Sequence, residues 1–176
     1  FLPCHPPLQD ELFAPLLEDL DASLINKDIF PNVISGFTDT SAELRELTVK
    51  AMIPIVTKLD HRNIAKLVKC FERMLSDPVG TIRANTTICC SRIADKLPEA
   101  QRKQLLGKCF SKACADSFAV SRRSALSGLA CTHHVFSPAE LATSLMPIVS
   151  RLMVDPEAEV RALAFQCAGT LVLRLQ

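Results

Sequence analysis

The stretch "DPVGTIRANTTICC", residues 77–90, places several reactive side-chain types within fourteen positions. A carboxylate and a guanidinium at short spacing could perform acid–base chemistry, and two adjacent cysteines could contribute to a metal site. The same residues could also do no more than hold two helices together. The choice depends on whether the spacing recurs elsewhere in the chain, because recurring positions are typical of a repeat architecture.

The acid and the base of this stretch do recur. The pattern is an aspartate, four residues, an apolar residue and an arginine, as at Asp77 and Arg83. The third copy has Ser121 at the apolar position. The copies are Asp39 with Arg45, Asp77 with Arg83, Asp116 with Arg122, and Asp155 with Arg161. Both the aspartates and the arginines lie 38, 39 and 39 residues apart. Chemistry rarely needs four evenly spaced copies, so the pattern predicts a structural role.

Helices must hold these residues in place. Apolar or small residues recur at helical spacing after each arginine, and a second amphipathic segment precedes each aspartate. Pro31 and Pro147 each stand eight residues before an aspartate, where proline removes a backbone hydrogen bond and bends a helix. The predicted unit is a bent helix, a turn opened by Asp, and a second helix. The expected pairs are 24–38 with 41–58, 61–76 with 79–96, 98–115 with 117–132, and 138–154 with 156–175.

Such helix pairs cannot bury their apolar faces alone, so the predicted fold is an all-α solenoid of about four stacked pairs plus a partial N-terminal repeat. We expect a single domain over 1–176, a fragment of a longer protein. The expected repeats are 1–23 (truncated), 24–58, 59–97, 98–136 and 137–176. Residues 9–22 would form the second helix of the truncated repeat, after an irregular lead-in.

The eight repeated residues are predicted to form a structural ladder. An Asp near the start of a helix accepts backbone N–H groups that lack partners, and an Arg fork can bridge to the Asp turn of its own or of a neighbouring repeat. Pro78 and Pro156 would stand at the starts of their helices, where proline is best tolerated.

Composition excludes several functions. The net charge is +1 and there are nine Phe but no Trp or Tyr, which disfavours a polyanion or single-stranded nucleic acid as the main partner. Seven of the eight cysteines fall inside apolar helical patterns, which indicates a reduced, cytoplasmic protein with no disulfide framework. No C-x-x-C pair and no apolar run of 18 residues occurs, so neither a metal site nor a transmembrane segment is expected.

Catalytic and cofactor motifs are also missing. The sequence has no glycine-rich phosphate loop, no G-x-S-x-G, no H-E-x-x-H and no kinase catalytic-loop pattern. We therefore predict no catalytic residues, no cofactor and no small-molecule substrate.

Two groups of residues are candidates for partner binding. Asn85 and Thr87 are polar where most other repeats carry hydrophobes, so they either tie neighbouring repeats together or face a ligand on the concave surface. Four cations of one helix either mark a solvated outer face or bind an anionic partner. These are Arg102, Lys103, Lys108 and Lys112. His133 and His134 follow a helix end, where they would cap its last carbonyl groups.

The Asp–Arg spacing with its upstream proline resembles the HEAT repeat. The segments "DIFPNVISGFTDT", "IRANTTICCSRIA", "SFAVSR" and "LMPIVSRLMVDPEAEVRALAFQ" further resemble the HEAT region of the Scy-like, or N-terminal kinase-like, pseudokinases. The resemblance implies an inactive kinase-like domain elsewhere in a longer parent. It also implies a cytoplasmic scaffold for coat or trafficking proteins, acting with the COPI coat at Golgi membranes in Golgi-to-endoplasmic-reticulum transport. A related branch of the family implies the alternative, a tRNA-binding adaptor for nuclear tRNA export.

Overall fold

The computed structural model describes residues 19–175, and within that range the regular structure is helical, with no strand. The first helix of each pair is formed by α2 (Ala22–Leu24), η2 (Ile25–Ile29), α3 (Phe30–Val33) and η3 (Ile34–Thr38); by α5 (His61–Met74); by α7 (Glu99–Ala113); and by α9 (Pro138–Glu140), η7 (Leu141–Leu145) and α10 (Met146–Leu152). The second helices are α4 (Ala42–Ile55) with η4 (Val56–Lys58), α6 (Gly80–Ile93) with η5 (Ala94–Lys96), α8 (Ala119–Thr132) with η6 (His133–Val135), and α11 (Ala158–Leu175).

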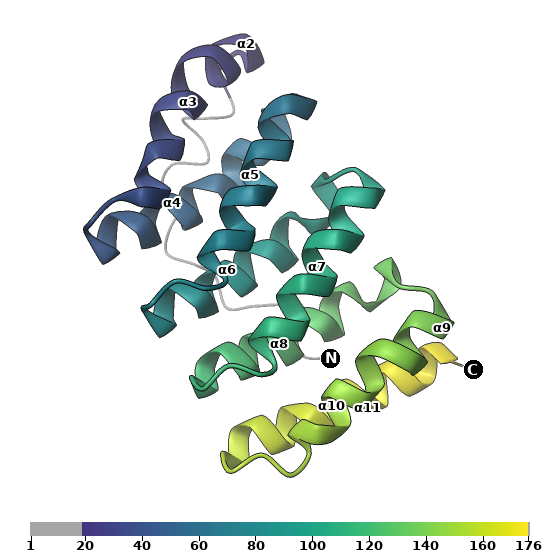
Figure 1. Ribbon diagram of the computed structural model, residues 1–176. Coiled ribbons are helices and arrows are strands. Elements are labelled where there is room, and N and C mark those ends of the chain that lie inside the picture. Colours follow the sequence, from purple (N-terminus) through teal and green to yellow (C-terminus); the bar gives the residue numbers. More distant parts are fainter. Residues whose placement is uncertain (1–18, 176) are drawn as a thin grey trace.

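The helix pairs stack side by side into two layers. The first helices form one layer and the second helices α4, α6, α8 and α11 form the other, as Figure 1 shows. Each second helix packs against the next one along the chain. The prediction of an all-α solenoid of about four helix pairs is confirmed. The predicted partial repeat, with its helix over 9–22, lies almost wholly outside the described residues.

The prolines of the first helices interrupt the regular backbone hydrogen bonds, as expected. Pro31 and Pro147 have no N–H, so the regular hydrogen-bond ladder is interrupted beside them. A π-helical turn precedes each one: the Phe30 N–H donates to the carbonyl of Ile25, and the Met146 N–H donates to that of Leu141. Widening the turn in this way lets the helix continue through a proline.

The turns before the second helices are longer than predicted. α6 begins at Gly80 and α11 at Ala158, so Pro78 and Pro156 lie in the turn and not in the first helical turn. The reason is that the Asp77 carboxylate accepts a hydrogen bond from the Val79 N–H at 2.9 Å, closing a turn before the helix starts. The expectation for these two prolines was wrong.

One continuous apolar core runs through the stack. Its largest fully buried side chains include Phe30, Phe37, Phe71 and Phe110. Phe37 and Phe71 come from neighbouring first helices and meet edge to face with ring centroids 5.9 Å apart, which ties these helices together. None of the helices in the described range is both long and apolar enough to traverse a bilayer.

The buried cysteines belong to this core. Burial raises the pKa of the Cys114 and Cys167 thiols to about 12, so both stay protonated and neutral at physiological pH. A protonated thiol in an apolar setting packs as a small hydrophobe.

Candidate functional site

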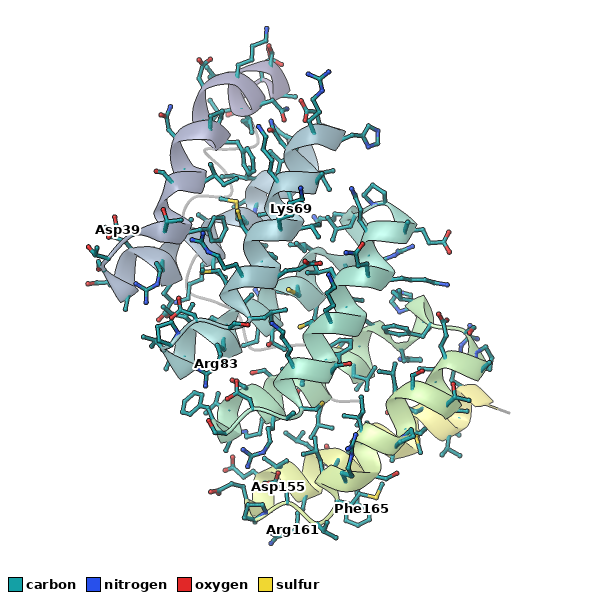
Figure 2. All side chains as sticks on the ribbon, viewed as in Figure 1. Asp39, Lys69, Arg83, Asp155, Arg161 and Phe165 are labelled. Atoms are coloured by element: carbon teal, nitrogen blue, oxygen red, sulfur yellow. The ribbon has the colours of Figure 1, made fainter. Side chains whose placement is uncertain are left out.

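The repeated arginines bind the carboxylates of the next repeat. Arg83 Nε donates to Asp116 Oδ2 at 2.6 Å and Arg83 Nη2 donates to Asp116 Oδ1 at 2.7 Å, a bidentate pair spanning 33 residues. Arg122 forms the same pair with Asp155, at 2.7 and 2.8 Å. The first rung, Arg45 with Asp77, has the same geometry at 2.7 and 3.1 Å. Figure 2 shows the labelled residues Asp39, Arg83, Asp155 and Arg161 along one edge of the solenoid.

Each arginine also binds the turn of its own repeat. Arg83 Nη1 donates to the carbonyls of Asp77 and Pro78, at 2.8 and 3.2 Å. The equivalent atom of Arg122 donates to the carbonyls of Asp116 and Ser117. One guanidinium therefore joins two successive turns through both its edges. The sequence did not decide whether each arginine would bind the turn of its own repeat or that of a neighbouring repeat. In the structure it binds both.

These ion pairs are largely shielded from water. The side chains of Arg122 and Asp155 are 10% and 5% exposed, and those of Arg83 and Asp116 are 18% and 8% exposed. The hydrogen bond from Arg122 lowers the pKa of Asp155, against the opposing effect of burial. At Asp116 burial alone would raise the pKa, but bonds from Arg83 and the Phe118 N–H outweigh it and the pKa falls.

The lowered pKa values predict acid sensitivity. Each carboxyl group binds a proton more weakly in the folded chain than in the unfolded one, so acid favours unfolding. The stabilisation from these pairs is complete above the ordinary aspartate pKa of about 4 and is lost as pH falls through the lower folded values. We expect the urea midpoint to stay constant down to about pH 5 and to decrease at lower pH. In the Asp155→Asn variant the decrease should be less steep, because one of the paired carboxyl groups is absent. An unchanged midpoint between about pH 5 and pH 3 would contradict this expectation.

The last rung is incomplete in the described residues. Arg161 Nη1 donates to the carbonyls of Asp155 and Pro156, at 2.7 and 2.9 Å, but no carboxylate of residues 19–175 pairs with its guanidinium. Phe165, four residues on, is 61% exposed, whereas Leu126 at the same repeat position is 1% exposed. A following helix pair covers Leu126, and α11 has no such cover among the described residues.

Asn85 forms a tie between neighbouring repeats. Its Nδ2 donates to Glu46 Oε1 of α4 at 3.0 Å, and the same Glu46 oxygen pairs with Lys50 at 3.0 Å. Asn85 is partly exposed. Of the two alternatives left by the sequence, the described contacts match the tie.

Thr87 does not lie on a binding surface. It is fully buried on α6, and its Oγ1 donates to the Arg83 carbonyl at 3.0 Å. Because the hydroxyl finds a partner one helical turn back, the residue can fill a position where other repeats carry hydrophobes. The alternative in which Thr87 faces a partner is therefore wrong, and its hydrogen bond stays within α6, so it does not match a tie between repeats either.

Three of the four cations of α7 contact the preceding helix pair, and Lys103 lies near carboxylates of α7 itself and of α9. Lys108 Nζ pairs with Glu72 Oε1 at 2.8 Å, and Arg102 Nη1 pairs with Asp95 Oδ1 at 3.3 Å. Lys103 lies 3.8 Å from carboxylates of Glu99 and Glu140. Lys112 Nζ donates to Ser76 Oγ at 2.6 Å. Most of this positive charge is thus balanced locally. Of the carboxylates involved, Glu99 shares α7 with Lys103, but Glu72, Asp95 and Glu140 come from other helical segments, so helical spacing did not reveal them.

The two histidines differ. His133 Nδ1 lies 2.8 Å from the carbonyl of Ala130, in keeping with the predicted capping of the helix end. His134 Nε2 lies 3.0 Å from Asp95 Oδ1, on the preceding helix pair. In the described part of the chain, no three His, Cys, Asp or Glu side chains converge as metal ligands.

Sequence comparison finds relatives of this chain among kinase-like proteins. No protein-family model matches the chain. It is 35% identical over 160 residues to the probable inactive serine/threonine-protein kinase scy1 of Dictyostelium discoideum, covering 91% of this chain and 20% of the relative. It is 26% identical over 148 residues to the protein kinase domain-containing protein ppk3 of Schizosaccharomyces pombe, covering 84% and 23%. The chain thus spans about a fifth of the length of these relatives.

Solved structures show the same architecture. The crystal structure of Cex1p superposes with a TM-score of 0.82 and 26% identity, covering 93% of this chain and 31% of that one. A designed armadillo repeat protein in complex with the peptide (KR)4 gives a TM-score of 0.57 at 14% identity, covering 93% and 80%. The second likeness concerns the fold alone. Together with the ladder, these structures define a helical-repeat solenoid of the HEAT and armadillo class.

Within that class, the chain is homologous to the inactive kinase scy1 and belongs to the HEAT-repeat region of the Scy-like family. The resemblance inferred from the sequence is confirmed at this level.

Proposed function

We propose that the chain is a non-catalytic protein-interaction scaffold, a HEAT domain over residues 1–176 within a longer kinase-like adaptor. Its partners would be coat or trafficking proteins at the cytoplasmic face of Golgi membranes, in COPI-associated transport. The chain's place in the Scy-like family supports a helical-repeat scaffold.

The second-helix layer carries the observation in favour of protein partners. Leu44 and Leu47, one helical turn apart on α4, are each 49% exposed. Asn85 occupies on α6 the repeat position that Leu47 has on α4, so this partly exposed residue extends the same face. Exposed aliphatic side chains beside a partly exposed amide suit a protein interface better than a phosphate backbone. Leu44, Leu47 and Asn85 are called the α4–α6 face below.

The contacts of α7 support the same choice. Binding of RNA relies on cations that can neutralise phosphates. Three of the four predicted cations are near carboxylates, although Lys108 remains 50% exposed. tRNA remains the alternative partner through the other branch of the family, and Lys108 and Lys112 are where it would bind.

Binding of purified COPI coat complex and of tRNA to the immobilised chain separates the two functions. We expect the coat complex to bind, and the double variant Leu44→Asp with Leu47→Asp to lose at least about tenfold in affinity because it places charges on the α4–α6 face. The matched variant Lys108→Glu with Lys112→Glu should retain coat binding. tRNA binding that is tight at low salt, weakens steeply with added salt and is lost in the lysine variant would favour the alternative.

A further inference from the structure

The first-helix layer opens between α7 and α10. α5 packs against α7, but α7 and α10 separate along a groove with a volume of about 480 Å³, the size of a small ligand pocket. Figure 1 shows the wider spacing of these two helices. The groove is lined by Ser111, Cys114 and Ala115 of α7 and the turn after it, and by Ile148, Arg151 and Leu152 of α10. Its walls are thus mostly apolar, with one guanidinium.

The repeat pattern shows what is missing at this junction. In the two repeats before this junction, the residue four positions before the ladder aspartate reaches back to the preceding first helix or to the turn that follows it. Arg73 Nη2 donates to the carbonyl of Phe37 at 2.8 Å, and Lys112 Nζ donates to Ser76 Oγ at 2.6 Å. Arg151 occupies the same repeat position before Asp155. It is exposed, and it makes no hydrogen bond or ion pair to any residue that the structure describes.

Arg151 therefore differs from its counterparts. Arg73 and Lys112 each bond to the preceding helix pair, while Arg151 has no such partner and lies beside an open apolar groove. An exposed guanidinium forms strong bidentate bonds to a carboxylate, and the gain is larger beside a surface from which a ligand excludes water. The lining residues Cys114 and Leu152 are buried, so the floor of the groove is uncharged.

We propose that the groove between α7 and α10 is a docking site for a peptide segment of a partner protein that carries an apolar side chain next to a carboxylate. The apolar side chain would enter between Ala115 and Ile148, and the carboxylate would pair with Arg151. This site lies on the first-helix layer, so it is additional to the α4–α6 face of the proposed function.

A displayed library of peptides of about twelve residues, selected on the 176-residue chain, tests the proposal. Counter-selection on Ala115→Trp, which fills the groove with an indole ring, removes peptides that bind elsewhere. We expect the remaining peptides to share an acidic residue beside an apolar one. Arg151→Glu should weaken the best of them by about tenfold or more and, in a fresh selection, should favour lysine or arginine instead of the acid.

Lys69→Glu is the matched control, because Lys69 is also an exposed first-helix cation but lies on α5, away from the groove (Figure 2). It should leave peptide binding unchanged.

Thermal melts check that each variant keeps its fold, and all three positions are exposed. Three results would overturn the proposal: no peptide is selected, the selected peptides bind Ala115→Trp equally well, or Arg151→Glu leaves their affinity and composition unchanged. Coat binding should survive Arg151→Glu, so failure here is separable from failure of the proposed function.

Discussion

Replacing Arg122 by alanine should lower the free energy of unfolding by about 3 kcal/mol, the cost of removing one partner from a well-shielded ion pair. The substitution leaves the Asp155 carboxylate, 5% exposed, without its bidentate donor. It also leaves the carbonyls of Asp116 and Ser117 without the Nη1 donor that joins them. Urea unfolding monitored by circular dichroism measures the change.

Arg161→Ala is the matched control for this result. Arg161 has the same residue type, the same repeat position and the same two carbonyl contacts as Arg122, but no carboxylate partner in the described residues. Its loss should cost about 1 kcal/mol or less. Equal effects of the two substitutions would show that the carbonyl contacts alone account for the role of these arginines.

Gly128→Ala should destabilise the chain by about 1–3 kcal/mol through overpacking between α6 and α8. A Cβ atom at this position would lie 2.2 Å from Ser91 Oγ and 3.1 Å from the ring of Phe110. The Ser91 hydroxyl would have to leave its hydrogen bond to the Thr87 carbonyl, or the two helices would have to separate. Thermal or urea unfolding detects the loss.

Gly107→Ala provides the opposite outcome on a neighbouring helix. A Cβ there meets nothing within 4 Å, so the better helix propensity of alanine should stabilise the chain by about 0.5–1 kcal/mol. Adding Ser91→Ala to Gly128→Ala should recover part of the lost stability, because it removes the nearest atom. If Gly128→Ala and Gly107→Ala change stability in the same direction, the close approach of α6 and α8 is not what requires glycine.

Much of the fold follows from the periodicity of the sequence. The interval between the arginines gave the number of helix pairs, and Pro31 and Pro147 marked where the first helices depart from regular geometry. The predicted starts of α6 and α11 were too early, because Pro78 and Pro156 were expected at the helix starts and lie in the turns before them. The side chain of Asp77 closes its turn through the Val79 N–H, and spacing alone does not show how many residues such a turn takes.

The candidate site could be predicted only in part, because its contacts cross between repeats. An Arg fork has the same reach toward its own turn and the next one, so the stacking distance of the pairs decides where Arg83 binds. Neither alternative for Thr87 considered a bond within its own helix, and a carbonyl of α6 satisfies the hydroxyl. The opening beside Arg151 depends on the spacing of α7 and α10, and no local pattern encodes that distance.

A double-mutant cycle on Arg83 and Asp116, measured by urea unfolding of the two single alanine variants and the double variant, tests most directly whether guanidinium–carboxylate pairs join successive helix pairs. The direct bonds of 2.6 and 2.7 Å between the two side chains predict a coupling energy of at least about 1 kcal/mol. Additive effects, within about 0.3 kcal/mol, would mean that the two residues stabilise the solenoid independently and would contradict the ladder.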